Sequence, residues 1–210
     1  MYLVDYHTHT RCSPDSEARL SDMVRAAQQA GARELCTTDH CDLQQADGTP
    51  LGEWDWGPIL EQFEEAEFFQ YREDFRLQLG LELGGGYTNP GRAEEILSGA
   101  PLDFVIGSVH NQSPDQGGWD PFYLDYRDEE LCRQLLEDYM SNLLRQAGQS
   151  CYDSLGHIIY PLRYINGRAG HRMILEPWRD QLDEVLRTVI ETGHAIEVNT
   201  HGGREVTDWL

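Results

Sequence analysis

Six short apolar runs along the chain predict β-strands, near residues 2–6, 33–39, 75–82, 103–109, 152–157 and 195–199. Between them, apolar residues at three- to four-residue spacing predict helices near 19–30, 58–73, 90–97, 127–147 and 176–192. A regular alternation of strands and helices is typical of a parallel α/β fold. The pattern therefore predicts one parallel sheet with helices packed on it.

Loops and helix ends follow from the turn-forming residues. Polar stretches rich in Gly and Pro predict long loops at 41–57 and 111–125. Ser16 and Ser21 are candidate N-caps for the first helix, and Gly31 is a natural residue to end it.

Residues that ligate metals recur where the predicted strands end. The five groups are His7 with His9, Asp39-His40, Glu82, His110, and His157. The carboxyl ends of parallel strands converge on one mouth of a barrel, whereas an open sheet builds its site at one switch point. Donors from at least five strand ends therefore favour a barrel.

The spacing of these donors suggests how they would act. His7 and His9 lie two residues apart on a strand, so both rings can face one metal, and Asp5 extends that face. A carboxylate such as Glu82 can bridge two cations. Imidazole and carboxylate donors together suit zinc, iron or manganese.

Several of these residues also have a simpler interpretation. We interpret His40 as a ligand and Asp39 as a residue that orients a ring, accepts a hydrogen bond or assists proton transfer. An isolated Asp-His pair would usually be a surface pair, and His110 and His157 could each be hydrogen-bonded core histidines. Repetition of the pattern at successive strand ends argues against those alternatives.

Other candidates carry weaker signals. Asp15 lies on the loop after His9 and could reach a peripheral metal, whereas His171 and His194 lack the strand-end context. Three residues follow the last two predicted strands and could line the same mouth, with an ordinary surface role as the alternative: Arg163, Arg204 and His201.

Charge and composition exclude several classes of protein. The chain of 210 residues has a formal net charge of -21, and all 16 of its basic residues are arginine. This charge argues against binding a nucleic acid polymer, and the absence of lysine excludes a Walker A loop and a Schiff-base lysine. Arginine can still grip a small phosphate.

The apolar runs are too short for a membrane helix, and the N-terminus shows no signal-peptide pattern. Five scattered cysteines without a CxxC pair indicate reduced thiols. We expect one cytoplasmic domain over 1–210.

The chain resembles the polymerase and histidinol phosphatase (PHP) superfamily. The resemblance rests on five ordered motifs, Asp5-x-His7-x-His9, Thr38-Asp39-His40, Gly80-x-Glu82, Ser108-Val109-His110 and Gly156-His157. The segments 157–164 and 197–204 are similar to those of the histidinol-phosphate phosphatase branch, in which their arginines bind the substrate phosphate.

The resemblance implies a distorted (β/α)7 TIM-like barrel that holds up to three divalent transition metals. It implies that His7 and His9 hold one metal, that Glu82 bridges it to a second held by His110 and His157, and that Asp15 and His40 hold a third. The superfamily normally has a further strand with a Ser-Asp-x-His segment. We therefore expect a barrel lacking its last strand and helix, with homodimerisation as one way to cover the gap.

The function implied is metal-dependent hydrolysis of a small phosphomonoester, with L-histidinol phosphate, an intermediate of histidine biosynthesis, as the substrate. Arg163 and Arg204 would clamp the phosphate. Two alternatives stay open, a PHP phosphoesterase acting on nucleotides or other small phosphoesters, and a barrel that binds metal without turnover.

Overall fold

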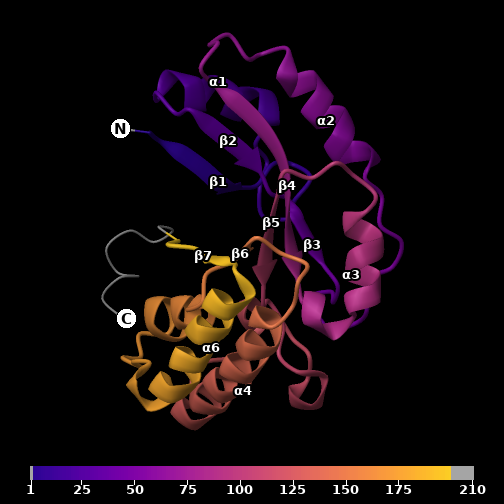
Figure 1. Cartoon of the computed structure of the whole chain (residues 1–210). Helices are drawn as coiled ribbons and strands as arrows, with labels where there is room; N and C mark the ends of the chain where they lie inside the picture. Colours follow the sequence, from indigo (N-terminus) through magenta and orange to yellow (C-terminus); the bar gives the residue numbers. More distant parts are fainter. Residues whose placement is uncertain (1, 200–210) are drawn as a thin grey trace.

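The computed structural model describes residues 2–199, in which one parallel sheet curls into a half-barrel (Figure 1). Its strands are β1 (Val4–Thr8), β2 (Glu34–Thr37), β3 (His40–Asp42), β4 (Arg76–Gly84), β5 (Phe104–Ser108), β6 (Ser154–Leu155) and β7 (Ala195–Ile196). The strand order is β1-β2-β4-β5-β6-β7, and β3 pairs with β4 beyond the end of β2. The predicted parallel α/β fold with barrel-like curvature is thus confirmed.

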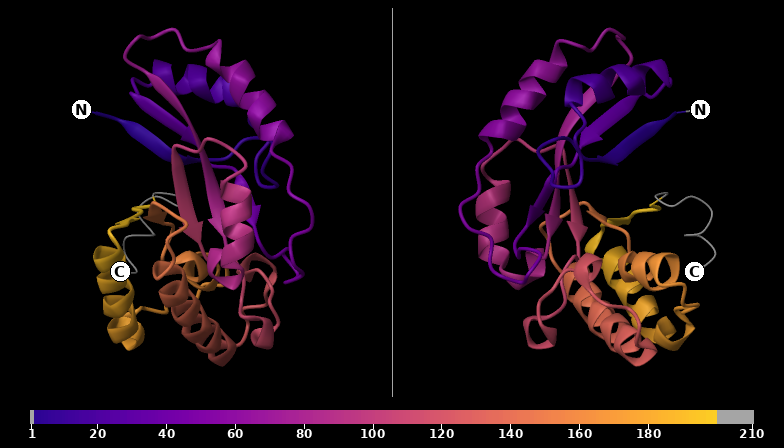
Figure 2. Two further views of the ribbon diagram at one scale, coloured as in Figure 1. Left: turned by 45° about the vertical axis from the view of Figure 1, so that its right-hand side comes forward. Right: turned by 180° about the vertical axis from the view of Figure 1, so that it is seen from behind.

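The helices line the outside of the curled sheet, as the two views of Figure 2 show. They are α1 (Leu20–Gln29), α2 (Gly57–Glu67), α3 (Pro90–Leu97), α4 (Glu129–Ala147), α5 (Tyr160–Leu162) and α6 (Arg179–Thr192). Single turns of 3-10 helix lie at Gly86–Thr88, Pro114–Gln116, Pro121–Tyr123 and Glu176–Trp178, and a π-helical segment spans Arg163–Arg168.

The predicted second strand, 33–39, is shorter in the structure, where β2 ends at Thr37. A further strand that the apolar pattern did not indicate, β3, follows it, and both strands pair with successive portions of β4. We predicted a loop from residue 41, but His40–Asp42 forms a strand because its backbone pairs with Glu82–Gly84. This cross-strand pairing has no local sequence signal, because the segment is short and polar.

The second predicted helix is too long, since α2 ends at Glu67 rather than near residue 73. The Gln28 side chain on α1 accepts hydrogen bonds from the backbone N–H groups of Tyr71 and Arg72, at 2.9 and 3.0 Å. These long-range bonds satisfy backbone donors outside a helix and stabilise a loop there.

The N-caps predicted for α1 are also wrong. Arg19 occupies the N-cap position without a side-chain bond, and the Ser16 hydroxyl donates to the His9 carbonyl oxygen instead. Gly31 does follow the helix end, with a φ of 83° that suits glycine.

Apolar side chains from the sheet and the helices form two clusters. The larger lies between β4, β5 and the helices α3, α4 and α6. The smaller joins α1, β2 and α2 through residues such as Leu20, Val24 and Leu35. The apolar side chains are buried on the outer side of the sheet. The carboxyl ends of the strands are therefore free to hold polar side chains.

Candidate metal centre

The carboxyl ends of the parallel strands bring the predicted metal ligands together. His7 lies on β1 and His9 just after it, while His40 opens β3 and pairs in register with Glu82 on β4. His110 and His157 each come two residues after their strands, β5 and β6. Register between neighbouring strands, rather than proximity in the sequence, sets these positions.

Glu82 lies at the middle of the cluster and is fully buried. One carboxylate oxygen, Oε1, lies 2.8 Å from His157 Nε2 and 3.2 Å from His110 Nε2. The other, Oε2, lies 3.0 to 3.2 Å from nitrogens of three histidines, His7, His9 and His40. Each oxygen therefore faces its own set of imidazoles, which is the arrangement a bridging carboxylate needs.

The donors in the described residues form four overlapping groups, each compact enough for one cation. They are His7, His9 and Glu82; His9, Asp15 and His40; Glu82, His110 and His157; and His40, Asp42 and His110. We call the third the buried centre and the second the rim group. Imidazole nitrogen with carboxylate oxygen is a donor set that divalent transition metals accept.

Several donor atoms in these groups lack hydrogen bonds although they are buried. Among the described residues, His9 Nε2, His40 Nδ1 and Glu82 Oε2 have no hydrogen-bond partner, yet both nitrogens lie within 3.2 Å of that oxygen. Buried polar atoms without partners are costly. A shared cation would satisfy all three, so these residues fit a metal site.

Two carboxylates that the sequence analysis missed lie behind the ligand rings. Glu197 Oε1 lies 2.6 Å from His7 Nδ1, and its Oε2 accepts the backbone N–H of His157. Asp42 Oδ1 lies 2.6 Å from His110 Nδ1. Both residues stand at strand ends, as the ligands do, so the same positional signal could have found them.

The carboxylates also change the protonation of the rings in the metal-free protein. Burial lowers the pKa of His7, but the nearby carboxylates of Glu197 and Glu82 outweigh it and raise the pKa to about 10. Burial likewise lowers the pKa of His9, but Asp15 and Glu82 raise it to about 9. At His157, burial together with the charges of His110 and His7 outweighs the contact with Glu82 and lowers the pKa. Binding of a cation by His7 and His9 would therefore release protons from these rings.

Asp39 accepts hydrogen bonds from the loop that follows β1, which is one of the roles predicted for it. Its Oδ1 accepts the backbone N–H of Thr10 at 2.7 Å and the Ser13 hydroxyl at 2.6 Å, and its Oδ2 accepts the Thr10 hydroxyl. The carboxylate is buried with both oxygens occupied. It therefore anchors the loop after β1, which carries Asp15.

Arg163 lies close to the buried centre through one intervening ring. Its guanidinium carbon is 5.6 Å from the centre of the Tyr160 ring, and that ring lies 5.2 Å from the His110 ring and 5.1 Å from the His157 ring. The other predicted phosphate-binding residues, Arg204 and His201, lie outside the described residues.

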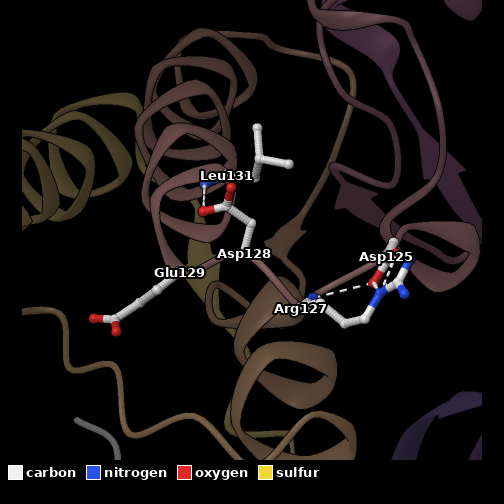
Figure 3. Close-up of a pocket in the computed structure, with 5 residues that line it drawn as sticks. All are labelled: Asp125, Arg127, Asp128, Glu129 and Leu131. Carbon is white, nitrogen blue, oxygen red and sulfur yellow. Dashed lines mark hydrogen bonds and ion pairs between the residues drawn. The ribbon is translucent and has the colours of Figure 1, made fainter.

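The two histidines without strand-end context are not among the donor groups. His171 Nε2 lies 2.5 Å from the Tyr126 carbonyl oxygen, and the His194 ring stacks on Tyr152. A separate hollow at the start of α4 contains none of the donors either (Figure 3). Its Arg127 pairs with Asp125, and its Asp128 caps α4.

The chain is similar in sequence and in structure to known proteins. A histidinol-phosphatase of Lactococcus lactis subsp. lactis is 31% identical over 209 residues, spanning 95% of this chain and 72% of that protein. The crystal structure of a histidinol phosphate phosphatase from Lactococcus lactis subsp. lactis, complexed with zinc, L-histidinol and phosphate, superposes with a TM-score of 0.73 at 24% identity. It is matched over 98% of this chain and 77% of that one.

A second crystal structure, of a Listeria monocytogenes protein assigned as a histidinol phosphatase, has a TM-score of 0.74 at 13% identity, over 98% of this chain and 89% of that one. Within residues 2–199, none of the helices has the length and apolarity needed to cross a membrane. The family model described as PHP domain matches residues 5–201. The chain therefore belongs to the PHP domain family.

Proposed function

We propose that this chain is a metal-dependent phosphomonoester hydrolase that acts on L-histidinol phosphate. The observation that carries the proposal is the position of Glu82, whose two oxygens face separate sets of imidazoles. Two metals bridged in this way suit in-line displacement at phosphorus. The 31% identity to a histidinol-phosphatase supports the substrate.

The donor groups support up to three cations. His7, His9 and Glu82 would hold one, Glu82, His110 and His157 a second, and His9, Asp15 and His40 a third. Zinc, manganese and iron all accept these donors. When bound, the cations would lower the pKa of an attacking water and stabilise charge on the phosphoryl oxygens.

The remaining residues would handle the substrate. Arg163 beside Tyr160 would grip the phosphoryl oxygens with its planar fork, together with Arg204 and with His201 lining the mouth. A guanidinium aimed at developing negative charge stabilises the transition state more than the ground state.

The test is the release of inorganic phosphate by the full chain loaded with zinc or manganese. We expect release from L-histidinol phosphate and little from nucleoside monophosphates. The opposite preference would replace the substrate with nucleotides. A metal-loaded protein that hydrolyses neither would contradict the proposed reaction.

One variant tests the phosphate clamp. We expect Arg163→Ala to lower kcat/KM by about 100- to 1,000-fold, the scale for one lost donor at such a site, with unchanged metal content. Arg187→Ala, on the exposed face of α6, is the matched control and should behave like the unmodified protein. Kinetics of Arg163→Ala that match this control would exclude the clamp.

A further inference from the structure

Asp42, the last residue of β3, connects two of the candidate ligand rings without belonging to the buried centre itself. Its Oδ1 lies 2.6 Å from His110 Nδ1, and its Oδ2 lies 3.6 Å from His40 Nδ1. The shorter contact has hydrogen-bond geometry and involves a buried residue. Asp42 therefore interacts chiefly with His110.

The two nitrogens of His110 face opposite partners. Nδ1 faces Asp42, while Nε2 lies 3.2 Å from both Glu82 Oε1 and His157 Nε2. A carboxylate can only accept at this contact, so Nδ1 must carry the proton. In the neutral ring the lone pair is then on Nε2, the atom that faces the other two donors of the buried centre.

Gly84 provides the space in which the Asp42 carboxylate lies. A Cβ atom at position 84 would be 1.7 Å from Asp42 Oδ1 and 3.0 Å from His110 Nδ1. Gly84 pairs with Asp42 on β3 and with Ser108 on β5, so the sheet holds it directly beneath this contact. Its φ is not in the left-handed region, so the requirement for glycine here is one of room.

We propose that Asp42 is a positioning residue for the buried centre, and that Gly84 is glycine because any side chain there would displace the Asp42 carboxylate from His110. Asp42 fixes the tautomer and orientation of the His110 ring, so that Nε2 is ready to bind a metal. This inference rests on the metal centre of the proposed function and assigns it two further residues.

The first measurement is zinc affinity of the full-length chain by competition with a chelator. We expect Asp42→Asn and Asp42→Ala to weaken binding of the zinc held by the buried centre by about 10- to 100-fold, the usual effect of losing such a partner. Asp42→Asn keeps the shape of the side chain, so it tests the charge even if Asp42→Ala folds poorly. Exposed Asp47→Asn is the matched control for loss of a carboxylate.

The second measurement tests Gly84 through a double-mutant cycle. Gly84→Ala should weaken zinc binding as Asp42→Ala does, and the double variant should be no more than a few-fold weaker than either, since both remove the same contact. Gly52→Ala, where an added Cβ meets nothing within 4 Å, is the matched control and should leave affinity unchanged. Additive losses would overturn the proposed link between the two residues.

A spectroscopic readout separates positioning from a general structural effect. In the zinc-loaded protein, proton NMR should show the Nδ1–H of His110 as a strongly downfield signal, because it donates a short hydrogen bond to Asp42, and this downfield shift should be lost in Asp42→Ala. Unchanged affinity and an unchanged Nδ1–H signal in the Asp42 variants would overturn the proposal.

Glu82→Ala is the reference variant that separates this inference from the proposed function. If it keeps its zinc, the metal centre itself is wrong. If it loses zinc while the Asp42 variants retain full affinity, only the positioning role fails.

Discussion

The buried centre and the rim group use the same kinds of donor in different surroundings. In the buried centre the side chains of Glu82, His110 and His157 are 0%, 6% and 6% exposed. In the rim group those of His9, Asp15 and His40 are 15%, 56% and 17% exposed. Electrostatic interactions are stronger away from water, so equal donors should bind a cation with unequal strength.

The two groups also differ in how their residues are held. The buried centre is supported by strand register, by the Ser108 hydroxyl that donates to Glu82 Oε1, and by Asp42 behind His110. Asp15 in the rim group lies on a loop that Asp39 anchors through Thr10 and Ser13. The comparison indicates that ligands at strand ends with buried support are preorganised, whereas Asp15 on its loop depends on a separate anchor.

The largest expected effect comes from removing Glu82, which belongs to the buried centre and also contacts His9 and His40 of the rim group. Glu82→Ala should lose nearly all bound metal, because its two oxygens serve every histidine of the cluster. In the metal-free protein it should lower the free energy of unfolding by about 3–5 kcal/mol, because protonated histidines lose a buried counter-charge. Elemental analysis and denaturant unfolding measure the two effects. Metal stoichiometry equal to that of the unmodified chain would contradict the bridging assignment.

A second pair of variants compares the two groups directly. His110→Ala should remove the most tightly held cation, whereas Asp15→Ala should remove one weakly held cation and leave the buried centre loaded. Timed chelation with metal analysis measures which equivalents leave first, and the rim cation should leave the unmodified protein before the buried one. The same release pattern in both variants would mean that burial does not distinguish the groups.

The smallest expected effect is a dependence on pH. Zinc binding at pH 8 should release protons from His7 and His9, whose pKa values in the metal-free protein are about 10 and about 9. Calorimetry in buffers of different ionisation enthalpy measures the release, which should decline as the pH rises through 9 and 10. Asp15→Ala should reduce it, since Asp15 helps raise the pKa of His9. If the number of protons released did not change over this pH range, the assignment of His7 and His9 as metal ligands would be contradicted.

The raised pKa values of His7 and His9 also affect the stability of the metal-free fold. Both folded-state pKa values lie above the unfolded value of about 6.5, so the protonated rings stabilise the fold fully below that pH. This contribution should be lost as the pH rises through 9 and 10. Thermal unfolding of the metal-free chain across this range measures the loss.

Much of the site could be predicted because it depends on local order along the chain. Apolar runs identified the strands, and polar residues directly after them identified His7, His9, His40, Glu82, His110 and His157, which the structure brings into one cluster. The parallel topology made this inference possible, since it sends every strand end to the same edge. The order of these motifs along the chain also indicated the PHP family.

The tertiary structure decided what depends on contacts between strands. Asp39 lies one residue before His40 and Asp42 two residues after it, yet Asp39 anchors a loop and Asp42 reaches His110, which follows β5. The strand β3 exists because β4 pairs with it, and Gly84 leaves room for a side chain 42 positions away. Periodicity along the chain indicates which side of a strand a residue faces, but only register between strands determines which side chain it meets.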